Sequence, residues 1–130
     1  MTELRHHQEV PGLKTANGYS HVVSGTGRIV VTAGQVALDE KGELVGPGDM
    51  EAQTRQVFTN LRSALAAEGA TFDNVLKITC YVTDLSRLPE VYAGSDEFLD
   101  LSRPPASATV QVSALVREDF LIEVEALAIV

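Results

Sequence analysis

Residues 103–130 read RPPASATVQVSALVREDFLIEVEALAIV, and this stretch decides the fold. Two prolines open it, a Ser/Thr-rich strand and a charged turn follow, and a closing strand ends in the apolar run ALAIV. Because side chains alternate between the two faces of a strand, Glu123 and Glu125 point the same way. The apolar end predicts that this strand lies inside a sheet, where carboxylates need a partner or a chemical role.

Upstream, the β-branched runs 19–24 and 28–38 are joined by Gly25-Thr26-Gly27, which predicts a β-hairpin. Gly34 falls inside the second run, where a missing side chain predicts a bulge or a point of close approach. Residues 1–17 are polar and interrupted by turn-forming residues, and we expect an irregular lead-in there.

Two helices are predicted in the middle of the chain. Asp49 is a suitable N-cap for the first, whose apolar stripe runs through Phe58, Leu61 and Leu65 and which Gly69 is expected to end. A strand over 75–83 separates it from a second helix over about 88–99, which carries a proline in its first turn.

The predicted order is therefore β-β-α-β-α-β-β, in a single domain over residues 1–130. We expect an α+β fold with hairpins at both ends and two helices packed on one face of a mixed sheet. Several strands are apolar on both sides, so the second face needs a cover. A partner chain is the simplest one.

Composition excludes several functions. A net charge of −8, with ten scattered Lys and Arg residues, argues against nucleic-acid binding. The sequence has no signal-like apolar segment and no run long enough to span a bilayer, so we expect a cytoplasmic protein without a membrane contact.

Cys80 is predicted to be a small core residue. His6, His7 and His21 lack metal-ligand spacing, so no metal is expected.

Six segments follow one another from Gly18 onward. They read YSHVV from Tyr19, VTAGQ from Val31, QTRQVFTNL from Gln53, NVLKITCYVTD from Asn74, RPPA from Arg103 with TVQV from Thr109, and IEVEA from Ile122. In this order and spacing they resemble the RidA/YjgF/UK114 family, whose members are also called endoribonuclease L-PSP.

This resemblance implies a chorismate-mutase-like fold and a homotrimer with small-molecule clefts between adjacent subunits. It also implies hydrolysis of reactive enamines and imines to carbonyl compounds and ammonia, without a cofactor or metal. Carried over to this chain, the cleft is lined by Tyr19, Gly34, residues 107–109 and Glu123. Glu123 then orients or activates the attacking water.

The chain departs from the family pattern at several of these positions. Ser107 stands where active deaminases carry an arginine that binds the substrate carboxylate, and Thr109 stands where a cysteine is common. Ala33 replaces a serine, and Tyr92 replaces an asparagine of the second helix. The cleft is therefore expected to suit a different ligand.

Three functions stay open at this stage. In the first, the chain is a hydrolase in which Glu123 is the general base and backbone N–H groups at Gly34 and Thr109 hold a developing negative charge. Arg103 or Arg28 is then the candidate anion clamp. The alternative for Glu123 is structural: Glu123 and Glu125 pair with Arg or Lys across the trimer interface. In the second function, a non-catalytic trimer uses the same cleft to bind a metabolite or a partner protein without turnover. The third, ribonuclease activity, is disfavoured by the acidic charge.

Overall fold

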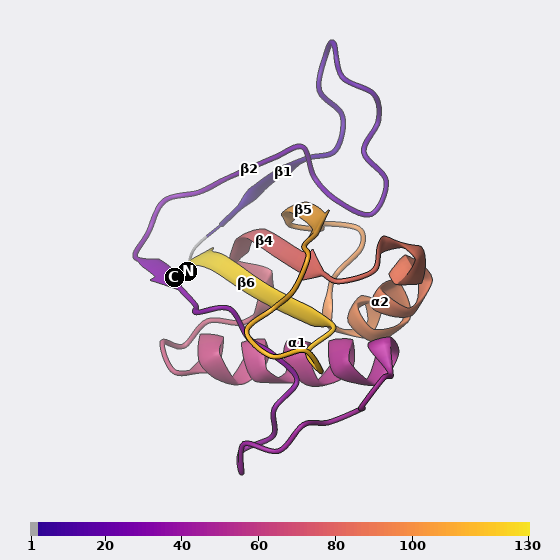
Figure 1. Ribbon diagram of the computed structural model, residues 1–130. Coiled ribbons are helices and arrows are strands. Elements are labelled where there is room, and N and C mark those ends of the chain that lie inside the picture. Colours follow the sequence, from indigo (N-terminus) through magenta and orange to yellow (C-terminus); the bar gives the residue numbers. More distant parts are fainter. Residues whose placement is uncertain (1–2) are drawn as a thin grey trace.

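Four strands form the central sheet of the computed structural model, which describes residues 3–130 (Figure 1). In spatial order they are β3 (Ile29–Val31), β6 (Ile122–Ile129), β4 (Val75–Val82) and β5 (Ala106–Gln111). The β4–β5 pair is parallel, whereas β6 is antiparallel to both of its neighbours. The sheet is therefore mixed, as expected.

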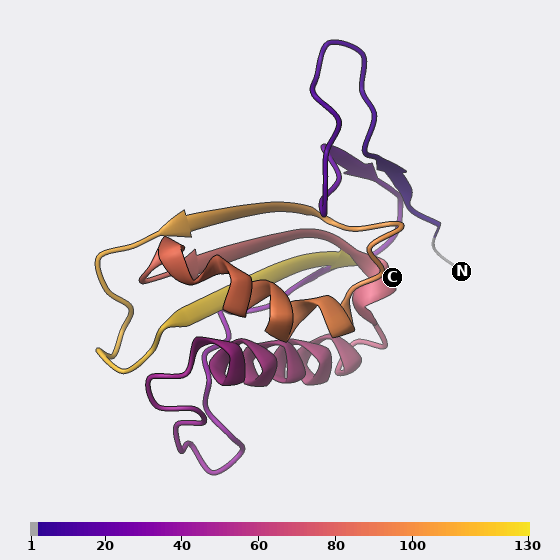
Figure 2. The same ribbon diagram turned by 90° about the vertical axis from the view of Figure 1, so that its right-hand side faces the viewer.

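Both α-helices pack on the same side of this sheet (Figure 2). They are α1 (Met50–Ala66) and α2 (Leu88–Ser95), accompanied by the 3₁₀ turns η1 (Phe72–Asn74), η2 (Leu85–Arg87) and η3 (Asp96–Phe98). Alternate residues of β4 and β6 face the helices and are buried, so one apolar core lies between the two layers. The α+β prediction is confirmed.

Helix α1 begins where the sequence predicts. The Asp49 carboxylate accepts a hydrogen bond from the backbone N–H of Ala52 at 3.0 Å and so caps the first turn. Phe58, Leu61 and Leu65 recur on one side of the helix and are almost fully buried against the sheet. This stripe fixes the orientation of α1.

The predicted N-terminal hairpin is wrong. Strand β2 (Val22–Ser24) pairs instead with β1 (Arg5–His7), which lies inside the segment expected to be irregular, and β3 pairs with β6. The glycine link is not a turn, because it crosses the end of β6: a Cβ atom at Gly27 would lie 2.8 Å from the carbonyl oxygen of Val130. Its glycines permit a close approach and not a reversal.

The predicted C-terminal hairpin is wrong as well. Strand β5 is joined to β4 through α2, and parallel neighbours need such a crossover. The link over residues 112–121 then carries the chain from the edge strand β5 past β4, so that β6 pairs on the other side of β4. A hydrophobic run followed by a charged turn does not show which strand the chain will join.

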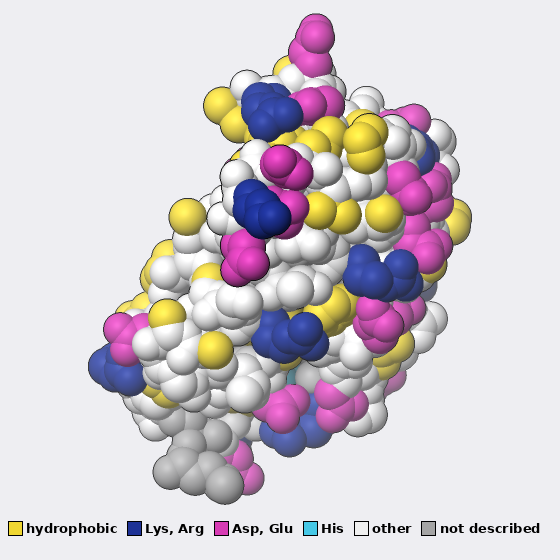
Figure 3. All heavy atoms as spheres, turned by 90° about the horizontal axis from the view of Figure 1, so that it is seen from below, with side chains coloured by type: hydrophobic (Ala, Val, Ile, Leu, Met, Phe, Trp, Pro, Cys, Tyr) yellow, Lys and Arg dark blue, Asp and Glu magenta, His cyan; other side chains and the backbone are white. Residues whose placement is uncertain are grey.

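The second face of the sheet is open in a single chain. Four large apolar side chains on β3, β5 and β6 are substantially exposed there, namely Ile29, Val31, Val110 and Leu127. On the side seen from below in Figure 3, by contrast, basic and acidic side chains lie beside one another. None of the helices described in residues 3–130 is long and apolar enough to cross a membrane.

Candidate functional site

Glu123 lies on the open face of the sheet, directly against Gly34. A Cβ atom at Gly34 would lie 2.7 Å from the carboxylate carbon of Glu123 and closer still to its Oε2 atom. Real side chains do not approach one another that closely, so only glycine leaves room for this carboxylate position. We call Gly34 and Glu123 together the Gly34–Glu123 half-site. The predicted close approach at Gly34 is confirmed.

A β-bulge forms the floor of this half-site. Thr32 N–H donates to the Ala126 carbonyl at 3.0 Å, and Gln35 N–H donates to the Val124 carbonyl at 2.8 Å. The three steps from Thr32 to Gln35 therefore correspond to two steps along β6, from Ala126 to Val124, and one extra residue in this way is the signature of a bulge. Ala33 and Gly34 lie outside the ladder, and the Gly34 N–H has no acceptor among residues 3–130. A free backbone donor thus lies beside the Glu123 carboxylate.

Tyr81 is a neighbour of this half-site that sequence reasoning missed. It pairs with Glu123 in the β4–β6 register, and its hydroxyl donates to Glu125 Oε1 at 2.6 Å. This hydrogen bond, with some burial and the two nearby carboxylates, raises the pKa of Tyr81. The alternation of β4 places Tyr81 on the same face as the predicted carboxylates, but only the register shows that they are paired.

A separate cavity lies on the other side of the sheet, between β5, α2 and the turn that follows α2. Ser107, Thr109 and Tyr92 line it, so the structure brings three of the predicted site residues together. The volume of this cavity is about 60 Å³. We call it the Ser107 cavity.

Register explains why the side chains of Ser107 and Thr109 lie on the helix side. They pair with Ile78 and Cys80 of β4, both of which are buried in the core beneath the helices. Neighbouring residues across a strand pair share a face. Burial raises the pKa of the Cys80 thiol to about 11, against a smaller opposing effect of the Thr109 hydroxyl. Cys80 is therefore a neutral core residue at physiological pH, as the sequence predicted.

The two groups of site residues lie on opposite faces of the sheet. Glu123 is paired with Tyr81 on the open face, whereas Thr109 is paired with Cys80 on the covered face. Successive β4 residues point to opposite sides, so a four-stranded sheet separates the Gly34–Glu123 half-site from the Ser107 cavity. One chain by itself cannot place Glu123 and Ser107 around one small molecule.

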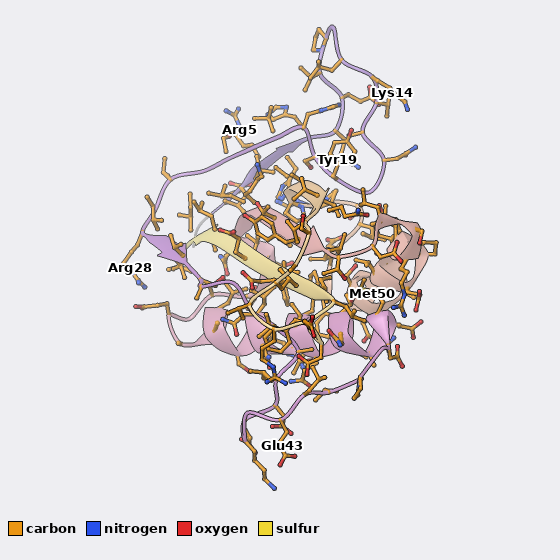
Figure 4. The ribbon with its side chains drawn as sticks, viewed as in Figure 1. Arg5, Lys14, Tyr19, Arg28, Glu43 and Met50 are labelled. Carbon is orange, nitrogen blue, oxygen red and sulfur yellow. The ribbon has the colours of Figure 1, made fainter. Side chains whose placement is uncertain are left out.

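Tyr19 is positioned beside the Ser107 cavity by the residues on either side of it. Gly18 lines the cavity, while Ser20 donates from its backbone N–H to Pro105 at 3.1 Å and from its hydroxyl to Pro104 at 2.6 Å. Tyr19 lies on the connection between β1 and β2, where its ring is edge-on to the ring of His21 with centroids 5.3 Å apart (Figure 4).

The two candidate anion clamps are engaged elsewhere. Arg103 donates to the Leu4 carbonyl at 3.2 Å and lines a different hollow near the N-terminal segment. Arg28 points outward at the end of the sheet away from Tyr19 (Figure 4), and it pairs with Glu68 at 2.8 Å. Neither side chain lines the Ser107 cavity.

No group of three His, Cys, Asp or Glu side chains within residues 3–130 is arranged to hold a metal ion. What the two regions offer is a carboxylate beside a free backbone N–H on one face, and a small cavity with hydroxyl groups on the other. This is a donor and acceptor set for orienting a water molecule and a small organic ligand.

Comparison with known proteins gives a consistent result. Residues 11–130 match the family model described as endoribonuclease L-PSP. A RutC family protein from Pyrococcus horikoshii is 40% identical over 119 residues, which cover 88% of this chain and 89% of the relative. The 2-iminobutanoate/2-iminopropanoate deaminase of Escherichia coli is 33% identical over 106 residues, covering 79% of this chain and 80% of that enzyme.

Among solved structures, the Rid-family protein YyfB from Yersinia pestis resembles this chain with a TM-score of 0.84. The two are 35% identical, and the match covers 98% of each chain. The likeness therefore extends over almost the whole described fold.

Proposed function

This chain belongs to the endoribonuclease L-PSP family, also called RidA/YjgF/UK114, and we propose that it hydrolyses a small imine or enamine to a carbonyl compound and ammonia. The observation that carries the proposal is the position of Glu123, whose carboxylate lies over Gly34 beside a free backbone N–H. The imine deaminase named among the relatives supports the reaction type.

In this reaction Glu123 accepts a proton from a water molecule as the water oxygen attacks the imine carbon. The proton then passes to the nitrogen, which gives a carbinolamine. A second proton moves from the hydroxyl group of the carbinolamine to the nitrogen, the C–N bond breaks, and ammonia leaves as the carbonyl forms. One water is consumed for each ammonia released. We assign to the Gly34 N–H, which has no backbone acceptor among residues 3–130, the role of donating to an atom that gains negative charge during the attack. The chemistry needs only side-chain and backbone groups of this chain.

We also propose that the site is completed between subunits of a homotrimer. In this assembly the Gly34–Glu123 half-site of one subunit faces the Ser107 cavity of the next, with Tyr19 beside that cavity. Two observations support it: the half-sites lie on opposite faces of one sheet, and the open face exposes Ile29, Val31, Val110 and Leu127. Large apolar side chains that are exposed on one face of a sheet, here beside Tyr81 and the two carboxylates, are typical of an interface.

The activity can be tested with imines generated in situ. An amine or amino-acid oxidase with catalase produces the imine, and semicarbazide traps whatever has not been hydrolysed. The proposal predicts that the purified protein lowers semicarbazone formation and raises early ammonia release above the uncatalysed rate. Heat-denatured protein serves as the control. Rates equal to that control, with both charged and uncharged imines, would contradict the proposal.

A second function, binding without turnover, is favoured by one observation. Ser107 supplies no charge, and no Lys or Arg of this chain lines the cavity that it occupies. The Escherichia coli relative acts on imino acids according to its name, so the absence of a cation argues that turnover of those compounds is weak here. In this case a ligand binds in the same cleft, and Glu123 positions it without activating water.

A further inference from the structure

The Ser107 cavity has a chemical character of its own. Much of its lining is apolar, with contributions from Ile78, Val91, Leu99, Leu101 and Pro105. Ser107, Thr109 and Ser95 add hydroxyl groups, which can accept or donate hydrogen bonds but carry no charge. Apart from Asp96, the cavity therefore presents an uncharged surface with a few polar contacts.

The ionisable groups along the lining add no positive charge. Cys80 is neutral, because burial raises its pKa to about 11, and the acidic residue at the rim is Asp96. A carboxylate that passes the exposed Ser107 toward the buried Ile78 and Cys80 would lose part of its hydration, meet no cation from this chain, and lie near another negative charge. Burying an unpaired carboxylate in this way is strongly unfavourable.

The size of the cavity limits what can enter. Its volume is about 60 Å³. Because a single water needs ~10–15 Å³ of such space, the cavity admits a group of only a few non-hydrogen atoms. A short alkyl chain or a carboxamide fits this description, and both would gain from contact with the apolar wall and the hydroxyl groups.

We propose that the Ser107 cavity is a subsite for a small uncharged substituent, so that this protein acts on imines that lack a carboxylate on the imine carbon. The inference rests on the proposed imine hydrolysis and deepens it by naming the substrate class. Hydrolysis of such an imine consumes one water and yields an aldehyde or ketone and ammonia. An amine-oxidising reaction is the class of reaction that supplies it.

The test compares two imines that differ only by a carboxylate. L-Amino-acid oxidase acting on L-2-aminobutanoate yields 2-iminobutanoate, and a flavin amine oxidase acting on propylamine yields propan-1-imine. With semicarbazide trapping, we expect the rate enhancement for propan-1-imine to exceed that for 2-iminobutanoate by at least about tenfold, equal to ~1.4 kcal/mol. An equal or greater enhancement for 2-iminobutanoate would overturn the proposal.

A charge placed in the cavity provides the matched control. Ser107→Arg should reverse the preference, because an arginine can pair with the carboxylate of 2-iminobutanoate. Ser113→Arg adds the same charge at an exposed position outside the cavity, and it should keep the parental preference. If both variants change the preference equally, the cavity does not set specificity and the proposal fails.

A binding measurement separates the subsite from the reaction and does not depend on a variant that folds. Calorimetry on the parent protein should give a Kd for 2-oxobutanamide at least about tenfold lower than that for 2-oxobutanoate. If this preference holds but neither imine is hydrolysed, the proposed activity fails and the subsite stands. If 2-oxobutanoate binds as tightly or more tightly, or neither compound binds, the subsite inference is overturned.

Discussion

The two faces of the central sheet are built from the same strands but are used in opposite ways. On the covered face, alternate residues of β4 and β6 pack beneath α1 and α2, and the polar side chains of Ser107 and Thr109 line a small cavity. On the open face, the intervening residues include Glu123, Glu125 and Tyr81. The covered face holds the fold together, whereas the open face leaves a carboxylate and its neighbours accessible.

This difference shows how a small domain can separate stability from chemistry. The buried apolar residues on the covered face are fixed by packing and tolerate little change. Those on the open face are held mainly by the β-bulge at Gly34 and by the Tyr81–Glu125 hydrogen bond. Substitutions on the covered face should therefore lower the free energy of unfolding, whereas substitutions on the open face should mainly affect imine hydrolysis and subunit assembly.

The largest effect is expected from Glu123→Gln, which keeps the shape of the side chain but removes the base. Loss of a general base typically lowers the rate ~10²–10⁴-fold. The melting temperature should stay near that of the parent, because the substitution lies on the open face. Imine hydrolysis and thermal unfolding are measured together, and Glu125→Gln serves as the control with a smaller loss. Unchanged hydrolysis by Glu123→Gln would remove Glu123 from the mechanism.

Truncating one apolar side chain on each face compares their roles in stability. Phe58→Ala should cost ~3–5 kcal/mol of unfolding free energy, because Phe58 is almost fully buried beneath the sheet. Val31→Ala should cost less than ~0.5 kcal/mol within one subunit, since Val31 is 68% exposed.

Denaturant unfolding measures the two costs, and analytical ultracentrifugation measures assembly. If the open face joins subunits, Val31→Ala should weaken the trimer while Phe58→Ala mainly destabilises each fold. Equal unfolding costs for the two variants would show that the faces do not differ as described.

Gly34→Ala tests whether the bulge positions Glu123. The added methyl group would overlap the carboxylate, which must move. A displacement of ~1 Å in a catalytic group can lower the rate ~10²-fold. Folding should change little, because the carboxylate lies at the end of a flexible side chain. The neighbouring Ala33→Ser substitution should leave hydrolysis near the parental level. Full activity of Gly34→Ala would show that the bulge does not position Glu123 for catalysis.

The smallest effect is expected at Cys80 on the covered face. Burial raises the thiol pKa from 9.0 to about 11, so the folded protein favours the neutral thiol. The resulting stabilisation is fully present below pH 9 and is lost as the pH rises toward 11. At pH 8 native Cys80 should react with iodoacetamide far more slowly than the denatured chain does, as mass spectrometry can measure. Equal reaction rates for the native and the denatured chain would show that the Cys80 thiol is exposed to solvent.

Much of the fold follows from local patterns. The alternation in residues 122–129 places Glu123 and Glu125 on one face, and the Asp49 cap with the Phe58 stripe predicts α1. Strand pairing does not follow in this way. The link at Gly25 and Gly27 has the composition of a turn, but hydrogen bonds between β3 and β6, nearly 100 residues apart, decide where the chain goes.

The candidate site shows the same limit. Gly34 could be predicted as a point of close approach, because a glycine inside a β-branched run usually marks either a bulge or a place where another group comes close to the backbone. The side of the sheet that Ser107 and Thr109 occupy depends on the β4–β5 register. That register is set through α2, so it cannot be read from the strand sequence. Tyr81 was missed for the same reason.

The central claim is that Glu123 of one subunit works with the Ser107 cavity of another, and subunit mixing tests it most directly. Glu123→Gln and the cavity-blocking variant Thr109→Trp should each be inactive alone. After the two are unfolded together and refolded in equal amounts, random cyclic trimers should have about a quarter of their clefts intact. We predict recovery of about a quarter of the parental imine hydrolysis. No recovery, in mixed trimers confirmed by native mass spectrometry, would contradict the shared site.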